Sequence, residues 1–121
     1  MISKKELSAL LHKLNIPVGE GEHFLDSQGK YPKVAYWEYL WSDTMASGKH
    51  YAEIVRYQVS FVSVRPRDTK LVELKRLINA EGLHPDIYHE YVKSGDTSQA
   101  KEQGVYHSYF YIDVAEELTD E

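Results

Sequence analysis

Hydrophobic and polar residues alternate with a period of two along two neighbouring stretches, residues 34–42 and residues 51–64. This alternation places successive side chains on opposite faces of a pleated strand, and the aromatic and β-branched residues suit a half-buried sheet. The pattern predicts a long β-hairpin, whose connection at residues 43–50 is too long for a tight two-residue turn. The sets predicted to share a face are Ala35, Trp37, Tyr39 and Trp41 in the first strand, and Val55, Tyr57, Val59 and Phe61 in the second.

Two other stretches carry apolar residues at three- and four-residue spacing, which is the pattern of an amphipathic helix. The first follows Ser3 and Glu6, which have the form of a capping box, and it ends before Pro17 because the residue before a proline avoids the helical conformation. The second spans residues 70–80 and is followed by Gly82, a common helix-ending residue. The apolar stripes consist of Leu7, Leu10, Leu11 and Leu14 in the first helix, and of Leu71, Leu74, Leu77 and Ile78 in the second.

Shorter stretches complete the predicted elements. Residues 16–24 form a brief strand or extended turn, and residues 87–92 and 105–114 form strands. The alternation slips at residues 61–64, which predicts a β-bulge or the sheet edge there. Polar residues 93–104 separate the last two strands. In the final strand one face carries Tyr106, Phe110, Ile112 and Val114, and the other carries His107, Tyr109, Tyr111 and Asp113.

The order of these elements is α-β-β-β-α-β-β. Consecutive strands with short links favour antiparallel pairing, so we expect an α+β fold in which two helices pack on a mainly antiparallel sheet of four to five strands. We expect a single domain over residues 1–121, of which residues 115–121 form an acidic, frayed tail. Both helices would cover one face, so the opposite face would expose Tyr and Trp side chains, as partner-binding surfaces do.

Composition narrows the possible functions. The chain of 121 residues contains no cysteine, which excludes disulfides, thiolate nucleophiles and cysteine-based zinc sites and suits a reducing cytoplasm. The net charge of −5 argues against a broad nucleic-acid-binding surface, because such surfaces usually carry positive charge. No run approaches the eighteen or so apolar residues of a membrane span, and the first residues lack the apolar core of a secretory signal. We therefore expect no membrane contact and no secretory signal.

Candidate chemistry is sparse. Six histidines are present without a metal-binding spacing such as H-x-x-x-H, and Glu20, Glu22 and His23 together favour a solvated turn over a metal site. His89 and His107 could face each other on neighbouring strands, where cross-strand packing is favoured over ligation. A Ser/His/Asp triad is assembled in space and is not excluded by sequence. We expect no enzyme activity, no catalytic residue, no metal and no cofactor.

An opening helix leads into Ile16-Pro17-Val18, and Tyr31-Pro32 precedes the long hairpin. Residues 53–64 then form the strand before a second helix with Leu71, Leu74 and Leu77, and residues 105–114 form the last strand. This arrangement resembles the small tail terminator, or tail-completion (tail-to-head joining), proteins of siphophages and related prophages. The resemblance covers nearly the whole chain, but residues 43–50 and 93–104 have no matching signature.

The resemblance implies a virion protein of the tail or neck, assembled in the host cytoplasm, that works by contact. Such subunits form a ring, commonly a hexamer, which caps the tail tube, stops its polymerisation and presents a surface to the head connector. The implied partners are further copies of the chain, the tail tube protein and the head–tail connector protein, with DNA passing through the lumen without specific binding. The residues predicted at subunit or partner interfaces are Trp37, Tyr39, Trp41, Met45, Lys49, His50, Tyr57, Tyr109 and Tyr111.

Other functions stay open at this point. A second structural possibility is another neck or connector component of the same particle. A small α+β ligand-binding domain or enzyme would instead show a pocket between sheet and helices that holds an ionisable group with a perturbed pKa. A nucleic-acid-binding domain would bind DNA in a salt-sensitive manner.

Overall fold

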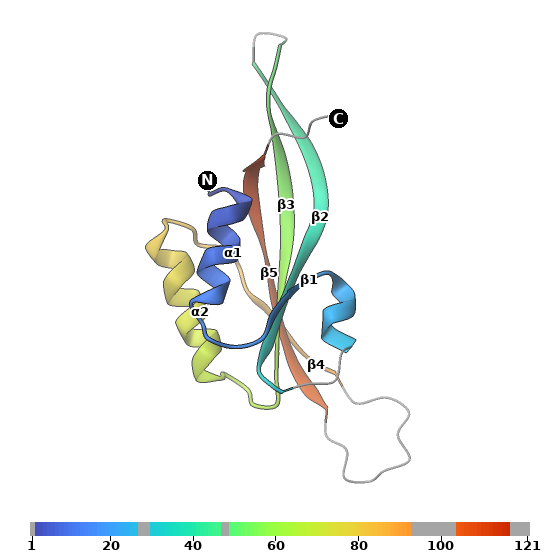
Figure 1. The fold of residues 1–121 in the computed structure, drawn as a ribbon, viewed down its shortest axis with the longest axis vertical. Coiled ribbons are helices and arrows are strands. Elements are labelled where there is room, and N and C mark those ends of the chain that lie inside the picture. The colour runs from blue at the N-terminus through green and yellow to red at the C-terminus, as the bar shows by residue number, and fades with distance from the viewer. Residues whose placement is uncertain (1, 27–29, 47–48, 93–103, 117–121) are drawn as a thin grey trace.

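The fold consists of two α-helices, one short 3-10 helix and a five-stranded sheet. In chain order these are α1 (Lys4–His12), β1 (Val18–Glu20), η1 (Glu22–Asp26), β2 (Lys33–Ala46), β3 (Lys49–Ser63), α2 (Thr69–Ala80), β4 (Tyr88–Val92) and β5 (Val105–Glu116). The computed structural model describes residues 2–26, 30–46, 49–92 and 104–116. The predicted α+β class and the element order are confirmed (Figure 1), with η1 as an addition between the first two strands.

The strands lie in the order β1-β2-β3-β5-β4. Pairing is antiparallel throughout except between β1 and β2, which run parallel. The two outermost strands are short: β1 pairs with β2 only at Val34–Tyr36, and β4 pairs with β5 only at Val105–Tyr109. Beyond those residues the sheet is three strands wide, with β3 in the middle.

Both helices form where local signals place them. At α1 the Ser3 hydroxyl accepts a hydrogen bond from the Glu6 N–H at 3.1 Å, and a Glu6 carboxylate oxygen accepts one from the Ser3 N–H at 2.9 Å, so the predicted capping box is confirmed. At α2 the Asp68 side chain accepts a hydrogen bond from the Lys70 N–H at 2.8 Å. Among the described residues no helix combines the length and apolar character that a bilayer crossing requires.

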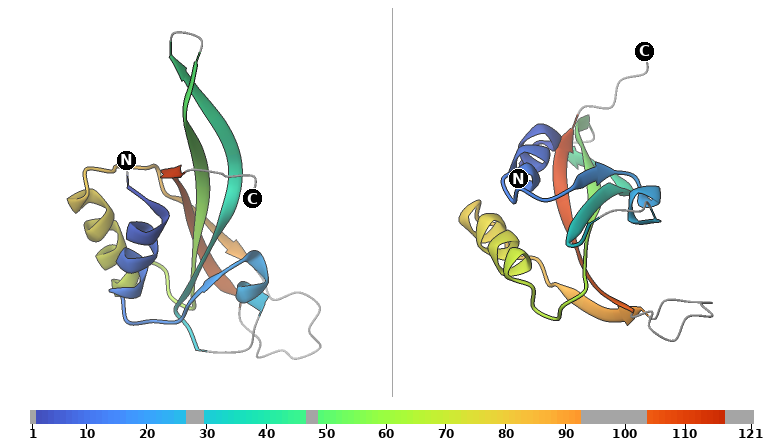
Figure 2. Two further views of the ribbon diagram at one scale, coloured as in Figure 1. Left: turned by 45° about the horizontal axis from the view of Figure 1, so that its top comes forward. Right: turned by 60° about the horizontal axis from the view of Figure 1, so that its bottom comes forward.

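The hydrophobic core lies between these helices and one face of the sheet (Figure 2). The predicted helix stripes are buried there, apart from Leu77, which is partly buried. From the sheet, alternate residues of β3 and β5 point into the same core, because cross-strand partners such as Tyr57 and Ile112 share a face. Fully burying one such large side chain is worth about 1.5–3 kcal/mol. The largest apolar side chains with no more than 1% exposure are Tyr57, Phe61, Phe110, Leu7, Leu11, Leu14, Leu74 and Ile78.

The β2–β3 hairpin is longer than the sequence indicated. Residues 43–46 and 49–50, predicted as part of a loop, are strand, and pairing continues to Ala46 opposite Lys49. The prediction was wrong because the hairpin extends past both helices (Figure 1), and a strand that no helix covers does not need alternating apolar residues. The described strands therefore leave only residues 47–48 between them.

The register shifts of the hairpin lie elsewhere than predicted. Pairing shifts between Glu38 and Leu40 and between Thr44 and Met45. Phe61 and Val62, in the region where a bulge or sheet edge was predicted, pair with both β2 and β5, and Ser63 pairs with β5, all without a register shift, so that prediction is wrong. The shift at Tyr39 inserts one extra residue, and a one-residue slip moves all following side chains to the opposite face.

Removing the α1 cap is expected to destabilise the protein. Ser3→Ala should lower the free energy of unfolding in urea by about 1 kcal/mol, because the orphan N–H groups of the first turn lose their acceptor. Ser8→Ala, a matched change inside α1, should not lower it. Equal stability of Ser3→Ala and the unmodified protein would contradict the role of the cap.

The cap should also contribute a pH dependence. The Ser3 backbone N–H and the Ser3 hydroxyl hydrogen-bond Glu6 and lower the pKa of its carboxyl from the ordinary 4.5. A lowered folded-state pKa stabilises the fold above the unfolded-state value and loses that contribution as the pH falls through the folded-state value. Acid titration of the free energy of unfolding should therefore show a smaller decline below pH 4.5 in Ser3→Ala than in the unmodified protein. A decline of the same size in both proteins would contradict this prediction.

Candidate functional site

The candidate site is the face of the sheet opposite α1 and α2, called here the open face. Among the described residues, η1 is the only helix on this side (Figure 2). Its Phe24 ring covers Gly19 of β1 so closely that a Cβ at Gly19 would collide with the ring. The described elements thus cover the β1 end of the open face and leave the part over β3, β5 and β4 without a helix.

Four tyrosines from three strands gather on the open face and form the tyrosine cluster, Tyr39, Tyr88, Tyr109 and Tyr111. The ring centroids of Tyr39 and Tyr111 lie 4.7 Å apart, those of Tyr109 and Tyr111 lie 6.2 Å apart, and those of Tyr88 and Tyr109 lie 5.4 Å apart. These are favourable separations for aromatic pairs. Tyr39 is 57% exposed and Tyr88 is 49% exposed. The cluster is therefore packed within itself and still presents aromatic surface to the outside.

An ion pair lies beside the tyrosine cluster. Arg56 of β3 donates two hydrogen bonds to Asp113 of β5, Nε to Oδ1 at 2.8 Å and Nη2 to Oδ2 at 3.2 Å. These bonds raise the pKa of the Arg56 guanidinium. Desolvation, with smaller effects of Tyr39 and Tyr109, raises the pKa of the Tyr111 phenol. The Arg56 guanidinium therefore stays charged and the Tyr111 phenol stays neutral at neutral pH, so neither is poised to exchange a proton.

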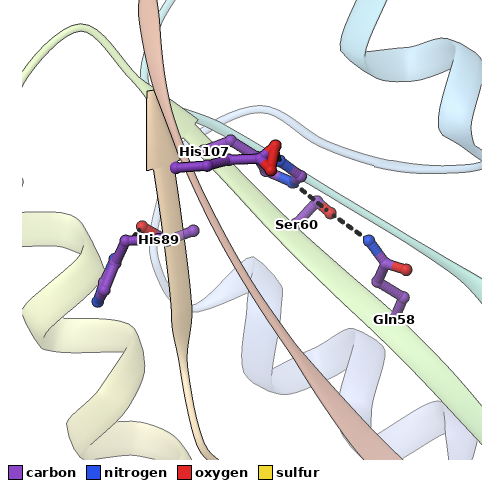
Figure 3. A network of polar contacts seen from close by, with 6 residues as sticks. Gln58, Ser60, His89 and His107 are labelled. Carbon is purple, nitrogen blue, oxygen red and sulfur yellow. Dashed lines mark hydrogen bonds and ion pairs between the residues drawn. The ribbon is translucent and has the colours of Figure 1, made fainter. Parts of the chain in front are cut away.

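A polar network continues the open face toward β4 (Figure 3). His107 Nε2 lies 2.8 Å from Ser60 Oγ, His107 Nδ1 lies 3.5 Å from a Glu90 carboxylate oxygen, and Gln58 Nε2 donates to Ser60 Oγ at 3.2 Å. The His107 ring also stacks on Tyr109 at 5.0 Å. The network therefore joins three strands under the aromatic cluster.

The order Ser60, His107, Glu90 is that of a serine-hydrolase triad, but the arrangement cannot perform that chemistry in this conformation. A nucleophilic hydroxyl must reach a substrate carbonyl, and Ser60 is 0% exposed. Gln58 also occupies a lone pair of the Ser60 oxygen. The network satisfies buried polar groups, as folded proteins require.

The predicted facing of His89 and His107 is wrong. They lie on neighbouring strands, but His89 pairs with Ser108 and His107 pairs with Glu90, so the two rings are on opposite faces. His89 Nδ1 lies 2.8 Å from Ser108 Oγ on the helix side (Figure 3). Across the described part of the chain, no group of three or more His, Asp or Glu side chains is placed to hold a metal ion.

The predicted interface residues are only partly brought together. Trp37, Tyr39, Tyr109 and Tyr111 share the open face, as expected from alternation. Trp41 does not: the bulge at Tyr39 places it opposite Val55, on the helix face of the sheet. Its side chain is 62% exposed because it lies at the outer edge of that face.

Tyr57 is corrected from an interface residue to a core residue. It is 0% exposed and contacts the Tyr36 ring at a centroid distance of 6.1 Å, so it cannot touch a partner in this conformation. Met45, Lys49 and His50 lie in paired strand, and their side chains are outside the described part of the structure. Sequence reasoning missed Tyr88, although the tyrosines of the predicted strand at residues 87–92 were a usable signal.

The chain was compared with known proteins by sequence and by structure. No family model matches it, and no curated protein matches it. Among solved structures, it is similar to the sheath/tube terminator of an extracellular contractile injection system in the extended state, with 12% sequence identity and a TM-score of 0.40. The match covers 96% of this chain and 55% of that one, so this chain spans about half its length. The similarity is one of coarse architecture.

Removing the centre of the polar network should cost stability. Ser60→Ala takes away the oxygen that Gln58 and His107 share, and loss of a buried hydrogen-bond partner is expected to lower the free energy of unfolding by about 1–2 kcal/mol. Urea unfolding measures the change. Ser42→Ala, the same substitution at an exposed position of β2, is the control and should change stability little. A Ser60→Ala protein as stable as the control would show that the network is not structural.

Proposed function

We propose that this chain is a structural subunit of a phage tail, a tail terminator or tail-completion protein that forms a ring on the tail tube. The main observation that supports this proposal is the tyrosine cluster, which lies with Trp37 on a sheet face that no described α-helix covers. Aromatic side chains combine a large apolar area with polar tips, and they are enriched where proteins contact each other. A half-exposed cluster of this kind supports a contact surface.

The polar groups around the cluster support contact in preference to catalysis. Arg56 is paired with Asp113, and Ser60 is buried beneath Gln58 and His107. Groups that are already satisfied within the subunit can be covered by a neighbour without leaving unpaired charges, which are costly when buried. We therefore propose a protein that carries out no reaction and needs no metal or cofactor.

The proposed partners follow from the kind of assembly. Identical subunits that contact each other through two different patches form a closed ring when repeated rotation from one subunit to the next returns to the first. The resemblance noted in the sequence implies that this ring is a hexamer. The ring would bind the end of the tail tube on one side and the head–tail connector on the other. The absence of cysteine suits assembly in a reducing cytoplasm.

Charge supports a passive role toward DNA. The chain carries a net charge of −5, and like charge discourages phosphates from adhering to a surface. In the proposed ring, DNA slides through the lumen without specific binding. A lumen lined mainly by lysine and arginine would contradict this part of the proposal.

The proposal is tested by the mass of the assembled protein. Native mass spectrometry and light scattering of the purified chain, alone and with the tail tube protein of the same particle, should show a closed ring either alone or on tube ends. Cryo-electron microscopy of capped tubes would locate the ring, and a ring that binds only the connector would assign the chain to the neck. A strict monomer that binds neither tube nor connector would overturn the proposal.

The tyrosine cluster should contribute to this assembly. The double change Tyr39→Ser and Tyr88→Ser removes the two most exposed rings of the cluster, and we expect assembly or tube binding to weaken at least about fivefold, as loss of more than 1 kcal/mol implies. Sedimentation at graded concentrations measures the shift. Val64→Ser, which removes a 48% exposed side chain outside the cluster, should leave assembly unchanged. Equal assembly of the double variant and the control would exclude the cluster from the contact.

A further inference from the structure

The outer half of the sheet has two different edges. Beyond its pairing with β1, β2 forms one edge from Trp37 onward, and beyond its pairing with β4, β5 forms the other from Phe110 onward. The two edges lie on opposite sides of β3 (Figure 1). On the β5 side, Ile2 makes a bridge to Val114 and so covers part of that edge.

The β2 edge carries a projecting apolar side chain, Trp41, called here the ridge; Leu40 beside it pairs with Arg56 and points to the open face. Leu40 is 45% exposed, and Trp41 at 62% is the most exposed of the large apolar side chains described. The Trp41 indole N–H donates a hydrogen bond of 2.8 Å to a Glu38 carboxylate oxygen. This bond satisfies the polar end of the ring and restrains its orientation, so the apolar part can be buried by a partner at reduced entropic cost.

The β5 edge carries a concave surface, called here the β5 groove. It consists of two adjoining hollows of about 390 and 240 Å³ that share Pro85, Tyr111 and Asp113. The segment between α2 and β4 passes along β5 and forms the outer wall with Leu83 and His84. Each hollow is far larger than the space that one water molecule needs, about 10–15 Å³.

We infer that Trp41 of one subunit inserts into the β5 groove of the next subunit, and that this contact joins neighbours around the ring. The inference rests on the proposed function, since it assumes self-assembly. A projecting apolar residue and a pocket elsewhere on the same surface make a heterologous contact, which repeats from copy to copy. A second copy is the occupant because the chain carries both halves at opposite edges, so each subunit uses its ridge once and its groove once.

The chemistry of the groove suits an indole. Leu83, Pro85 and the Tyr111 ring supply apolar surface, and the charged groups nearby, Arg56 and Asp113, are already paired with each other. Tryptophan is enriched among interface hot spots, which lie in well-packed pockets and cost about 2 kcal/mol or more on truncation. Trp41→Ala should therefore weaken subunit association by roughly thirtyfold or more.

Tryptophan fluorescence tests the insertion directly. The chain has two tryptophans, so in Trp37→Phe the emission comes from Trp41 alone. As this variant assembles with rising concentration, or on tube ends, its emission should shift to shorter wavelength and become shielded from acrylamide, while native mass spectrometry records ring formation. Ring formation without any shift would overturn the inference and leave the proposed ring standing.

Complementation tests which surfaces meet. Trp41→Glu removes the ridge and Pro85→Arg fills the groove, so each variant alone should stay monomeric with an unchanged circular dichroism spectrum. Mixed, the two retain one intact ridge and one intact groove, and native mass spectrometry should detect a heterodimer that stops there. Val64→Glu, an exposed substitution away from both edges, should still form the ring. A Trp41→Glu protein that assembles like this control would overturn the inference.

Other outcomes distinguish failure of the proposed function from failure of the subunit contact. If the unmodified protein stays monomeric and binds no tube, both the proposed function and this inference fail. If the Trp41 emission shifts only with tube protein, and subunits still assemble when Trp41 is replaced by Glu, the ridge binds the tube and the subunit contact proposed here is wrong. Assembly that is lost in Trp41→Glu and restored as a heterodimer with Pro85→Arg supports both.

Discussion

One-sided burial of the sheet is the constraint from which the other features of this protein follow. Two helices press Leu11 and Leu74 against β3 and β5, and the residues that meet them, such as Tyr57 and Phe110, are 0% exposed. Two amphipathic helices of this length can cover only one face. The polar groups on the other face must find their partners among the strands themselves, and the face is built from side chains that tolerate both packing and water.

The open face achieves this with aromatic stacking over paired polar groups. Tyr109 stacks on His107, His107 contacts Ser60, and Arg56 is held by Asp113. The contacts of His107 with Ser60 and of Arg56 with Asp113 each join β5 to β3, so they reinforce the register of the sheet as well as filling its surface. The same arrangement that removes chemical reactivity from Ser60 leaves a rigid aromatic surface, which is the property that an assembly contact needs.

A single bulged residue gives the two edges of the sheet their different characters. Tyr39 is the extra residue in β2, and it moves Trp41 from the open face to the edge of the helix face. Bulges protect exposed edges from indiscriminate strand pairing. In this chain the bulge also turns an indole outward beside Glu38, while the opposite edge at β5 is bordered by the segment that contains Pro85 and remains concave.

Sequence by itself determined the features that depend on near neighbours. The Ser3 cap, the helix stripes and the alternation of β5 were all predicted and found, since each needs only residues a few positions apart. Tertiary structure decided the rest. The bulge, the opposite facing of His89 and His107, the burial of Tyr57 and the edge position of Trp41 depend on which residues pair across strands. Alternation within one strand cannot specify that pairing, because a slip of one residue inverts every face without changing the local sequence.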